Sequence, residues 1–234
     1  MKLKMFKNST LGVTLSCFAV LTYAETNKVG GGISLGATRV IYPMEAKQVS
    51  LPVINHSMKE RYLINSWVET QNEKKSDSFL VTPPLFVAEP TTENTLRIVN
   101  LAKDLPQDRE SVFWLNVKSI PSVDKEVLAE KNILQLAVLS RIKIFVRPEK
   151  LKIAPENALQ NVKFIKTADG VDVDNQSPYH ISFVNLELDK AQLNSVMVAP
   201  LEKTKISKIK GNKLSYQIVN DYGGVSPKVE VNLN

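Results

Sequence analysis

Two cations in apolar surroundings are the residues of this chain best suited to chemistry. Arg39 lies in the run GATRVIYP, and Lys143 lies in RIKIFVRP between Ile142 and Ile144. Removing a cation from water without a partner is costly in free energy. Each of the two side chains is therefore expected either to reach solvent or to bind an anion.

Signals for enzymatic catalysis or metal binding are nearly absent. The chain has two histidines, His56 and His180, and one cysteine, Cys17, so the usual zinc ligand sets cannot be assembled. The carboxylates lack the spacing of a calcium loop, and there is no phosphate loop, dinucleotide fingerprint or nucleophile elbow. Both histidines are better explained as structural residues. We expect a protein that is not an enzyme and that uses no metal or cofactor.

The N-terminus has the features of a cleavable export signal. Three lysines lie in the first seven residues, an apolar run covers 11–21, and Thr22 and Ala24 occupy the positions that a signal peptidase reads. The apolar run is shorter than the roughly 20 residues that span a bilayer. We therefore expect cleavage after Ala24 and no insertion into the membrane.

Cys17 lies within this signal, so the mature chain is expected to have no disulfide. A lipid-modified cysteine is the alternative, but Thr14 stands where a lipoprotein signal usually has leucine, and an ordinary residue of the apolar run is preferred. Loss of the signal removes three lysines and no acid, which lowers the formal net charge from +6 to +3. The remaining basic residues are scattered among acids, so nucleic-acid binding is not expected.

Alternating apolar residues, β-branched side chains and turn formers predict an all-β protein. Seven strands are expected before Pro148, at residues 33–42, 49–55, 62–70, 79–87, 95–101, 111–119 and 133–146. This number and spacing are typical of an immunoglobulin-like sandwich. Five further strands are expected after Pro155, at residues 161–166, 179–188, 192–199, 213–219 and 228–232.

These strands predict two domains of unequal size. After a signal at 1–24, we expect an N-terminal immunoglobulin-like domain at 25–147 and a smaller C-terminal β-sandwich at 156–234. Pro148 and Pro155 bound a stiff connector at 148–155.

The segment 132–148, NILQLAVLSRIKIFVRP, is predicted to form one unusually long strand. Leu134, Leu136 and Val138 share one face and the residues between them share the other, and either face could be the core face. Fifteen extended residues of this segment would span about 50 Å, beyond the usual strand of about 3–10 residues. Such a strand must bend, bulge or do something besides filling its own domain.

Six motifs extend over both predicted domains and are specific enough to indicate a family. They are GATRVIYP at 36–43, YLINSWVE at 62–69, TPPLF at 82–86, LPQDRESVFWLNVKSIP at 105–121, the strand at 134–148, and NDYGG at 220–224. In this order they resemble the periplasmic chaperones of chaperone–usher pili, the PapD family. The resemblance implies two immunoglobulin-like domains in a boomerang arrangement, with a cleft between them, and a location in the periplasm.

The resemblance also implies how such a protein binds its client. Arg39 and Lys143 match the pair of cations that anchors the C-terminal carboxylate of a pilus subunit. Leu134, Leu136 and Val138 match the alternating apolar residues that the chaperone lends to a subunit lacking its own last strand. Two cations on rigid strands can form charge-assisted hydrogen bonds to one carboxylate, which fixes the register of the bound chain.

Two further features concern the geometry of the cleft. Glu110, Arg147 and Asp221 match the family's ionic link between the domains, and we expect this link to set the domain angle more than the stability, because exposed ion pairs are typically worth about 0–1 kcal/mol. Val138 and Lys143 are five residues apart and would point to opposite faces of a regular strand. We therefore expect a bulge between them, or a cleft that wraps the end of the strand.

The implied function is that of a chaperone that binds, folds and caps pilus subunits by donor-strand complementation and delivers them to an outer-membrane usher. Its partners would be major, minor and adhesin subunits and the usher, and its exposed apolar edge also suggests self-association when unliganded. The alternative is a structural pilus subunit or another secreted immunoglobulin-like binding protein. A subunit would have one incomplete domain and an N-terminal donor peptide, whereas this chain has two domains and a short glycine-rich leader.

Overall fold

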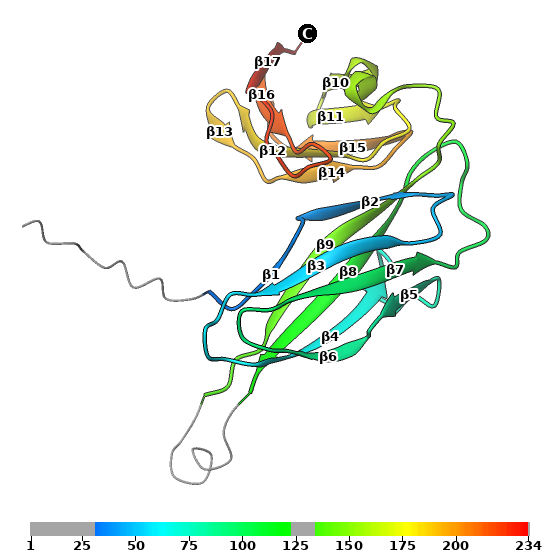
Figure 1. Ribbon diagram of the computed structural model, residues 1–234. Helices are drawn as coiled ribbons and strands as arrows, with labels where there is room; N and C mark the ends of the chain where they lie inside the picture. Colours follow the sequence, from blue (N-terminus) through cyan, green and yellow to red (C-terminus); the bar gives the residue numbers. More distant parts are fainter. Residues whose placement is uncertain (1–30, 123–133, 234) are drawn as a thin grey trace, which may run out of the picture.

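The computed structural model describes residues 31–122 and 134–233, which form two lobes built almost entirely of β-strands. Figure 1 shows β1 to β9 in one lobe and β10 to β17 in the other, joined where β9 ends. Each lobe contains two separate sheets around its own apolar core. The prediction of an all-β fold with two sandwich domains is confirmed, while the predicted export signal at 1–24 lies outside the described residues.

The first lobe is a sandwich of a four-stranded and a five-stranded sheet. The four-stranded sheet contains, in spatial order, β1 (Ile33–Leu35), β3 (Val49–Asn55), β7 (Glu93–Asn100) and β5 (Phe79–Thr82). The five-stranded sheet contains β2 (Arg39–Pro43), β9 (Val138–Arg147), β8 (Ser111–Pro121), β4 (Tyr62–Glu69) and β6 (Leu85–Ala88). All neighbouring strands are antiparallel except β2 and β9, which run parallel.

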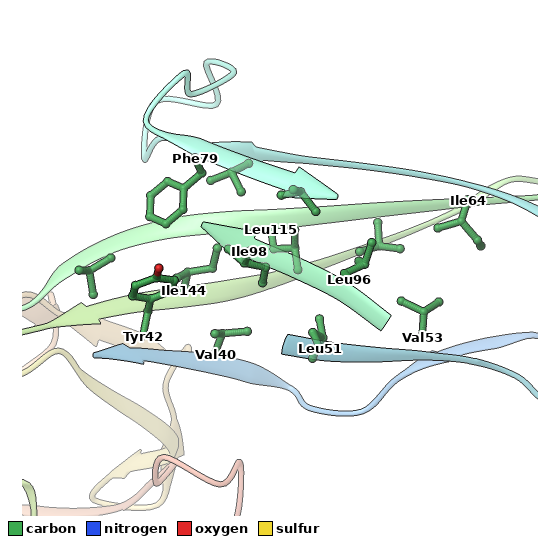
Figure 2. Close-up of a cluster of buried hydrophobic side chains, with 14 of the residues drawn as sticks. Val40, Tyr42, Leu51, Val53, Ile64, Phe79, Leu96, Ile98, Leu115 and Ile144 are labelled. Carbon is green, nitrogen blue, oxygen red and sulfur yellow. The ribbon is translucent and has the colours of Figure 1, made fainter. Parts of the chain in front are cut away.

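The core of this lobe lies between the two sheets, as Figure 2 shows for side chains of β2, β3, β7, β8 and β9. Leu96, Leu115 and Ile144 are fully buried there, and burying each contributes about 1.5–3 kcal/mol. Tyr42 is also fully buried, but its hydroxyl donates a hydrogen bond to the carbonyl of Ala46 at 2.9 Å and accepts one from the amide of Asn100 at 3.1 Å. The polar end of this ring is therefore satisfied.

Two predicted strands are wrong because the chain crosses from one sheet to the other within them. The segment 33–42 breaks at Gly36, so that β1 pairs with β3 and β2 pairs with β9. A side chain at Gly36 would come within 2.9 Å of the Pro52 ring, so only glycine permits this crossing without a shift. The segment 79–87 breaks at Pro83 and Pro84, so that β5 pairs with β7 and β6 pairs with β4.

The second lobe is smaller and follows a short 3₁₀ helix (Pro155–Asn161). One of its sheets contains β10 (Val162–Thr167), β11 (Gly170–Asn175) and β15 (Glu202–Ser207). The other contains β13 (Ala191–Gln192), β12 (Ile181–Leu188), β16 (Lys213–Ile218) and β17 (Val229–Asn232), with β14 (Val196–Val198) also paired to β12. Neither β11 nor β15 corresponds to a predicted strand.

Each lobe contains a buried asparagine at the end of a strand that makes the same set of hydrogen bonds. The amide nitrogen of Asn55, at the end of β3, lies 2.8, 3.1 and 3.0 Å from three backbone carbonyl oxygens. The amide nitrogen of Asn175, at the end of β11, likewise lies 2.8, 3.3 and 2.9 Å from three carbonyl oxygens. In both cases the side-chain oxygen accepts the amide of the serine two residues later, Ser57 or Ser177. The two domains thus share this local hydrogen-bond motif.

Candidate functional site

The parallel pairing of β2 with β9 brings Arg39 and Lys143 together. They are register partners, so their side chains lie next to each other on the same face of the sheet. The Nη1 atom of Arg39 donates to the carbonyl of Val219 in the second lobe at 3.3 Å, and its guanidinium lies 5.9 Å from the centre of the Phe145 ring. The two cations therefore face the junction between the lobes.

Neither cation has an anionic partner within the part of the chain that the structure describes. The Nε atom of Arg39 is buried and lacks a hydrogen-bond acceptor among those residues. Burial lowers the pKa of Lys143, and the positive charge of Arg39 lowers it further. Burial also lowers the pKa of Arg39, although the charges of Asp221 and Glu110 oppose this change. Two half-buried cations side by side form a site that would bind an anion.

The edge of β9 becomes free at the position of this cation pair. On one side β9 pairs with β8 along its length, from Val138 to Val146. On the other side β2 covers β9 only from Lys143 to Arg147, and no described strand pairs with 138–142. Five residues of β9 therefore offer unpaired backbone groups next to the anion site.

The apolar residues predicted to serve a client lie at and before the start of this strand. Leu134, Leu136 and Val138 are 81%, 65% and 61% exposed. β9 begins at Val138, so the predicted strand at 133–146 is wrong at its start, where 134–137 lie outside any strand and Ile133 lies outside the described residues. Instead of a backbone ladder, the side chain of Gln135 donates to the carbonyl of Pro121 at 2.7 Å.

β9 is a regular strand, so of the two expected alternatives the bulge between Val138 and Lys143 is wrong, and the cleft that wraps the end of the strand is the alternative left. The register with β8 runs from Val138 to Val146 without a shift. Ile144 and Val146 face the core, which places Val138 on the core face by alternation and Lys143 on the opposite face. Val138, the one of the three apolar residues that lies within β9, and Lys143 therefore lie on opposite faces of this strand.

The residues of the predicted interdomain link are in direct contact. Arg147 donates from Nε to Glu110 at 2.8 Å and from Nη1 and Nη2 to Asp221 at 2.7 and 2.9 Å. Its guanidinium also lies 5.0 Å from the centre of the Tyr179 ring. Burial lowers the pKa of Arg147, but the hydrogen bonds to Asp221 and the charge of Glu110 outweigh this effect and raise the pKa overall. The three residues join the end of β9, the segment before β8 and the loop after β16.

The two acids of this link differ greatly in burial. The side chain of Glu110 is 2% exposed, whereas that of Asp221 is 38% exposed. Glu110 also accepts the amide of His180 at 2.8 Å, contacts the Nδ1 atom of the same residue at 3.3 Å, and donates its own amide to the carbonyl of Pro178 at 2.9 Å. The interdomain link was expected to consist of exposed ion pairs, and this expectation does not hold for Glu110.

His180, Pro178 and Val219 are interdomain contacts that were not assigned from the sequence. Two of them contribute backbone atoms, Pro178 and Val219, so their side-chain types carry no signal. The His180 ring packs against Phe145 with the ring centres 5.5 Å apart, which agrees with the structural role expected for it. These contacts become visible only when the two lobes are seen together in the structure.

The described residues contain no cluster of three or more His, Cys, Asp or Glu side chains that could hold a metal ion. Within the same residues, helices long and apolar enough to cross a bilayer are absent.

Comparisons with known proteins identify the family. Residues 32–152 match the N-terminal domain of PapD, described as a pili and flagellar-assembly chaperone, and residues 157–230 match the C-terminal domain of the pili assembly chaperone PapD. The resemblance expected from the six sequence motifs is thereby confirmed.

Individual relatives cover nearly the whole chain. The probable fimbrial chaperone SfmC of Escherichia coli K12 is 49% identical over 216 residues, which is 92% of this chain and 94% of SfmC. The crystal structure of the periplasmic chaperone SfaE has 42% identity and a TM-score of 0.75 and covers 85% of this chain and 98% of SfaE. The SafB chaperone of Salmonella enterica, solved with the SafA pilin, has 26% identity and a TM-score of 0.77 over 86% of this chain and 96% of its own. The chain belongs to the PapD family of pilus-assembly chaperones.

Proposed function

We propose that the protein is a periplasmic chaperone that holds pilus subunits by adding the free edge of β9 and the residues before it to their incomplete fold. One observation carries this proposal: the unpaired edge of β9 at 138–142 ends at the cation pair Arg39 and Lys143. A peptide strand laid along this edge would gain main-chain hydrogen bonds, and its terminal carboxylate would meet the two cations.

This arrangement predicts the direction of the bound strand. The cations lie at the C-terminal end of the free edge, where β2 begins to cover β9. A client whose C-terminal carboxylate is held there must approach along 138–142 from the N-terminal end of β9. It therefore runs parallel to β9, in line with β2, which is itself parallel to β9.

The apolar residues supply most of the affinity in this mechanism. Burial of the exposed side chains of Leu134, Leu136 and Val138 would contribute about 1.5–3 kcal/mol each. An ion pair that replaces solvent around Arg39 and Lys143 gains less, because desolvation offsets much of the attraction. The cations consequently act mainly to set the register of the client.

The interdomain residues have a positioning role in this proposal. Glu110, Arg147 and Asp221 hold the lobes at a fixed angle and thereby keep Val219 beside Arg39. We assign the N-terminal domain to 25–147, the connector to 148–155 and the C-terminal domain to 156–234, after cleavage of a signal behind Ala24. Delivery of subunits to an outer-membrane usher completes the proposed pathway.

The relatives support this proposal. Members of the family are pilus-assembly chaperones rather than enzymes, and SafB is described in complex with a pilin. We accordingly assign no catalytic residue or cofactor. The alternative of a structural pilus subunit is disfavoured by two sandwich domains, each with its own core.

Co-expression with the pilus subunits encoded beside the chaperone tests the proposed function. In periplasmic extracts, wild-type protein should keep the major subunit soluble and co-purify with it, whereas Lys143→Ala should lose most of this recovery. Lys163→Ala is the matched control, because Lys163 is an exposed strand lysine in the second lobe. Equal recovery of the subunit with all three proteins would refute the anchoring role.

A further inference from the structure

Tyr222 has no evident role in the fold. Its side chain is 96% exposed, and every other aromatic side chain in the described residues is buried or half-buried. An aromatic ring in this state adds no core packing and makes no hydrogen bond through its hydroxyl within the described residues. Fully exposed aromatic rings of this kind are frequent among the residues that dominate protein interfaces.

The loop that carries Tyr222 is held rigidly. The side-chain oxygen of Asn220 accepts the amides of Tyr222 and Gly224 at 3.0 and 2.8 Å, and the backbone of Asn220 exchanges hydrogen bonds with Gly223 and Gly224. Gly223 has a φ of +85°, and a side chain there would come within 2.2 Å of the Thr38 hydroxyl oxygen. Tyr222 is therefore presented in a defined position at little further entropic cost.

The same loop touches both functional elements of the cleft. Its residue Val219 accepts the hydrogen bond of Arg39, and Gly223 lies against Thr38, the residue before Arg39. Asp221, next to Tyr222, binds Arg147. A chain end that reaches Arg39 must consequently lie beside this loop.

A pocket of about 460 Å³ opens next to Tyr222. Apolar side chains of Leu159, Ile181 and Ile218 line it together with Arg147 and the ring of His180. It combines apolar surface with a cation already neutralised by two acids, so it suits an uncharged side chain better than an anion.

We propose that Tyr222 and this pocket form a second contact for the pilus subunit, on the C-terminal domain, beside the carboxylate anchor. The inference rests on the proposed function and extends it. The occupant is the apolar surface of the subunit next to its C-terminal carboxylate, because that end is the part of the client brought to Arg39 and Lys143. The C-terminal domain then binds the client directly instead of only supporting the N-terminal domain.

The test compares complexes of the major pilus subunit with wild type, Tyr222→Ala, Tyr222→Phe and Ile209→Ala. Ile209 is the matched control, because it is an exposed apolar residue of the loop before β16, whereas Tyr222 lies in the loop after β16. The subunit is chased from each purified complex with an excess of labelled wild-type chaperone. We expect release from Tyr222→Ala to be about tenfold faster, as for a residue that dominates an interface, and release from Tyr222→Phe and Ile209→Ala to stay within about twofold of wild type.

A second measurement separates contact from indirect effects. Tyr222 is the one exposed tyrosine of the described residues, so tetranitromethane should nitrate it readily in the free protein. We expect protection of Tyr222 in the complex. Unchanged release from Tyr222→Ala, or equal nitration in the free and bound states, would overturn the inference while leaving the proposed function intact. Failure of wild type to form any complex would overturn both.

Discussion

Replacing Glu110 by alanine should lower the free energy of unfolding far more than replacing Asp221, although both acids bind Arg147 at similar distances. Breaking a buried ion pair typically costs about 3–5 kcal/mol, and Glu110 is almost completely buried. In Glu110→Ala, Asp221 remains as a partner of Arg147. We therefore expect the lower end of this range, a loss of about 3 kcal/mol in the free energy of unfolding. The side chain of Asp221 is more than one-third exposed, and Asp221→Ala should cost about 0–1 kcal/mol.

A second contribution acts in the same direction. Glu110 accepts the buried amide of His180, and an unsatisfied buried donor costs about 1–3 kcal/mol. Asp221 makes no comparable bond to a backbone amide in the described residues. The difference between the two variants should therefore be at least about 2 kcal/mol.

Urea unfolding followed by two signals measures this difference. Both tryptophans, Trp67 and Trp114, lie in the five-stranded sheet, so fluorescence reports the N-terminal domain, while far-UV circular dichroism reports both domains. In Glu110→Ala the two transitions should separate, and the summed free energy of unfolding should fall by about 3 kcal/mol. If Glu110→Ala and Asp221→Ala agree within about 0.5 kcal/mol, burial does not control the strength of the link and the reasoning is refuted.

Three other substitutions test separate parts of the molecule. Lys143→Met should raise the free energy of unfolding at neutral pH, by less than about 1 kcal/mol because solvent screens this half-buried group, since burial and the charge of Arg39 disfavour the ammonium form, while capture of subunits is lost. Since the pKa of Lys143 is lowered on folding, this advantage should shrink as the pH rises past that lowered value and vanish above the ordinary lysine pKa of 10.5. Leu136→Glu should leave the free protein folded and abolish subunit capture, because this exposed side chain is buried only in the complex. Asn175→Ala should cost about 3 kcal/mol, because it removes a buried amide that serves three carbonyl groups.

Each of these outcomes has a control. Lys163→Met should change neither stability nor capture, and a constant gap between Lys143→Met and wild type from neutral pH to above 10.5 would show that Lys143 is not the titrating group. Leu139→Glu alters the opposite face of β9, and equal loss of capture in it and Leu136→Glu would contradict the assignment of the donor face. A loss below about 1 kcal/mol in Asn175→Ala would mean that water replaces the amide at those carbonyls.

Strand type was predictable from the sequence, but strand partners were not. The run from residue 33 to 42 is rich in β-forming residues on both sides of Gly36, but its core-facing positions change from Ile33 and Leu35 to Val40 and Tyr42, where the two halves join different sheets. The pairing of Arg39 with Lys143 depends on the same non-local choice, because it requires β2 to lie parallel to β9. Their proximity was expected only through the family resemblance.

The two strands that were not predicted are stabilised by each other. β11 reads GVDVDN and β15 reads EKTKIS, and neither has strong β propensity because of its charges. In the sheet, Asp172 and Asp174 face Lys205 and Lys203 across the ladder, with Lys203 lying 3.4 Å from Asp172 on the diagonal. Cross-strand pairs of opposite charge compensate for the poor propensity of each strand alone.

The length of the strand ending at Arg147 was overestimated for a related reason. The apolar alternation continues back to Leu134, but a strand needs a neighbour for its backbone, and pairing with β8 stops at Val138. Residues 134–137 have strand sequence without a ladder partner on either side among the described residues. A segment that pairs with another chain should show this pattern, so the proposed function would account for the excess length seen in the sequence.

β9 carries two cations, Lys143 and Arg147, on one face, and the residue between them keeps their surroundings distinct. Lys143 and Arg147 are separated by Phe145, which is buried beneath the Arg39 guanidinium and the His180 ring. Arg147 has two acidic partners and a raised pKa, whereas Lys143 has no acidic partner in the part of the chain that the structure describes and has a lowered pKa. If the acids could reach Lys143 instead, the anchor would be neutralised and the link lost. The buried Phe145 ring lies between the ion pairs of Arg147 and the two cations Arg39 and Lys143, which have no anionic partner among the described residues. In the proposed function, the carboxylate of a client would supply that partner, and the free protein gives up some stability to keep the site open.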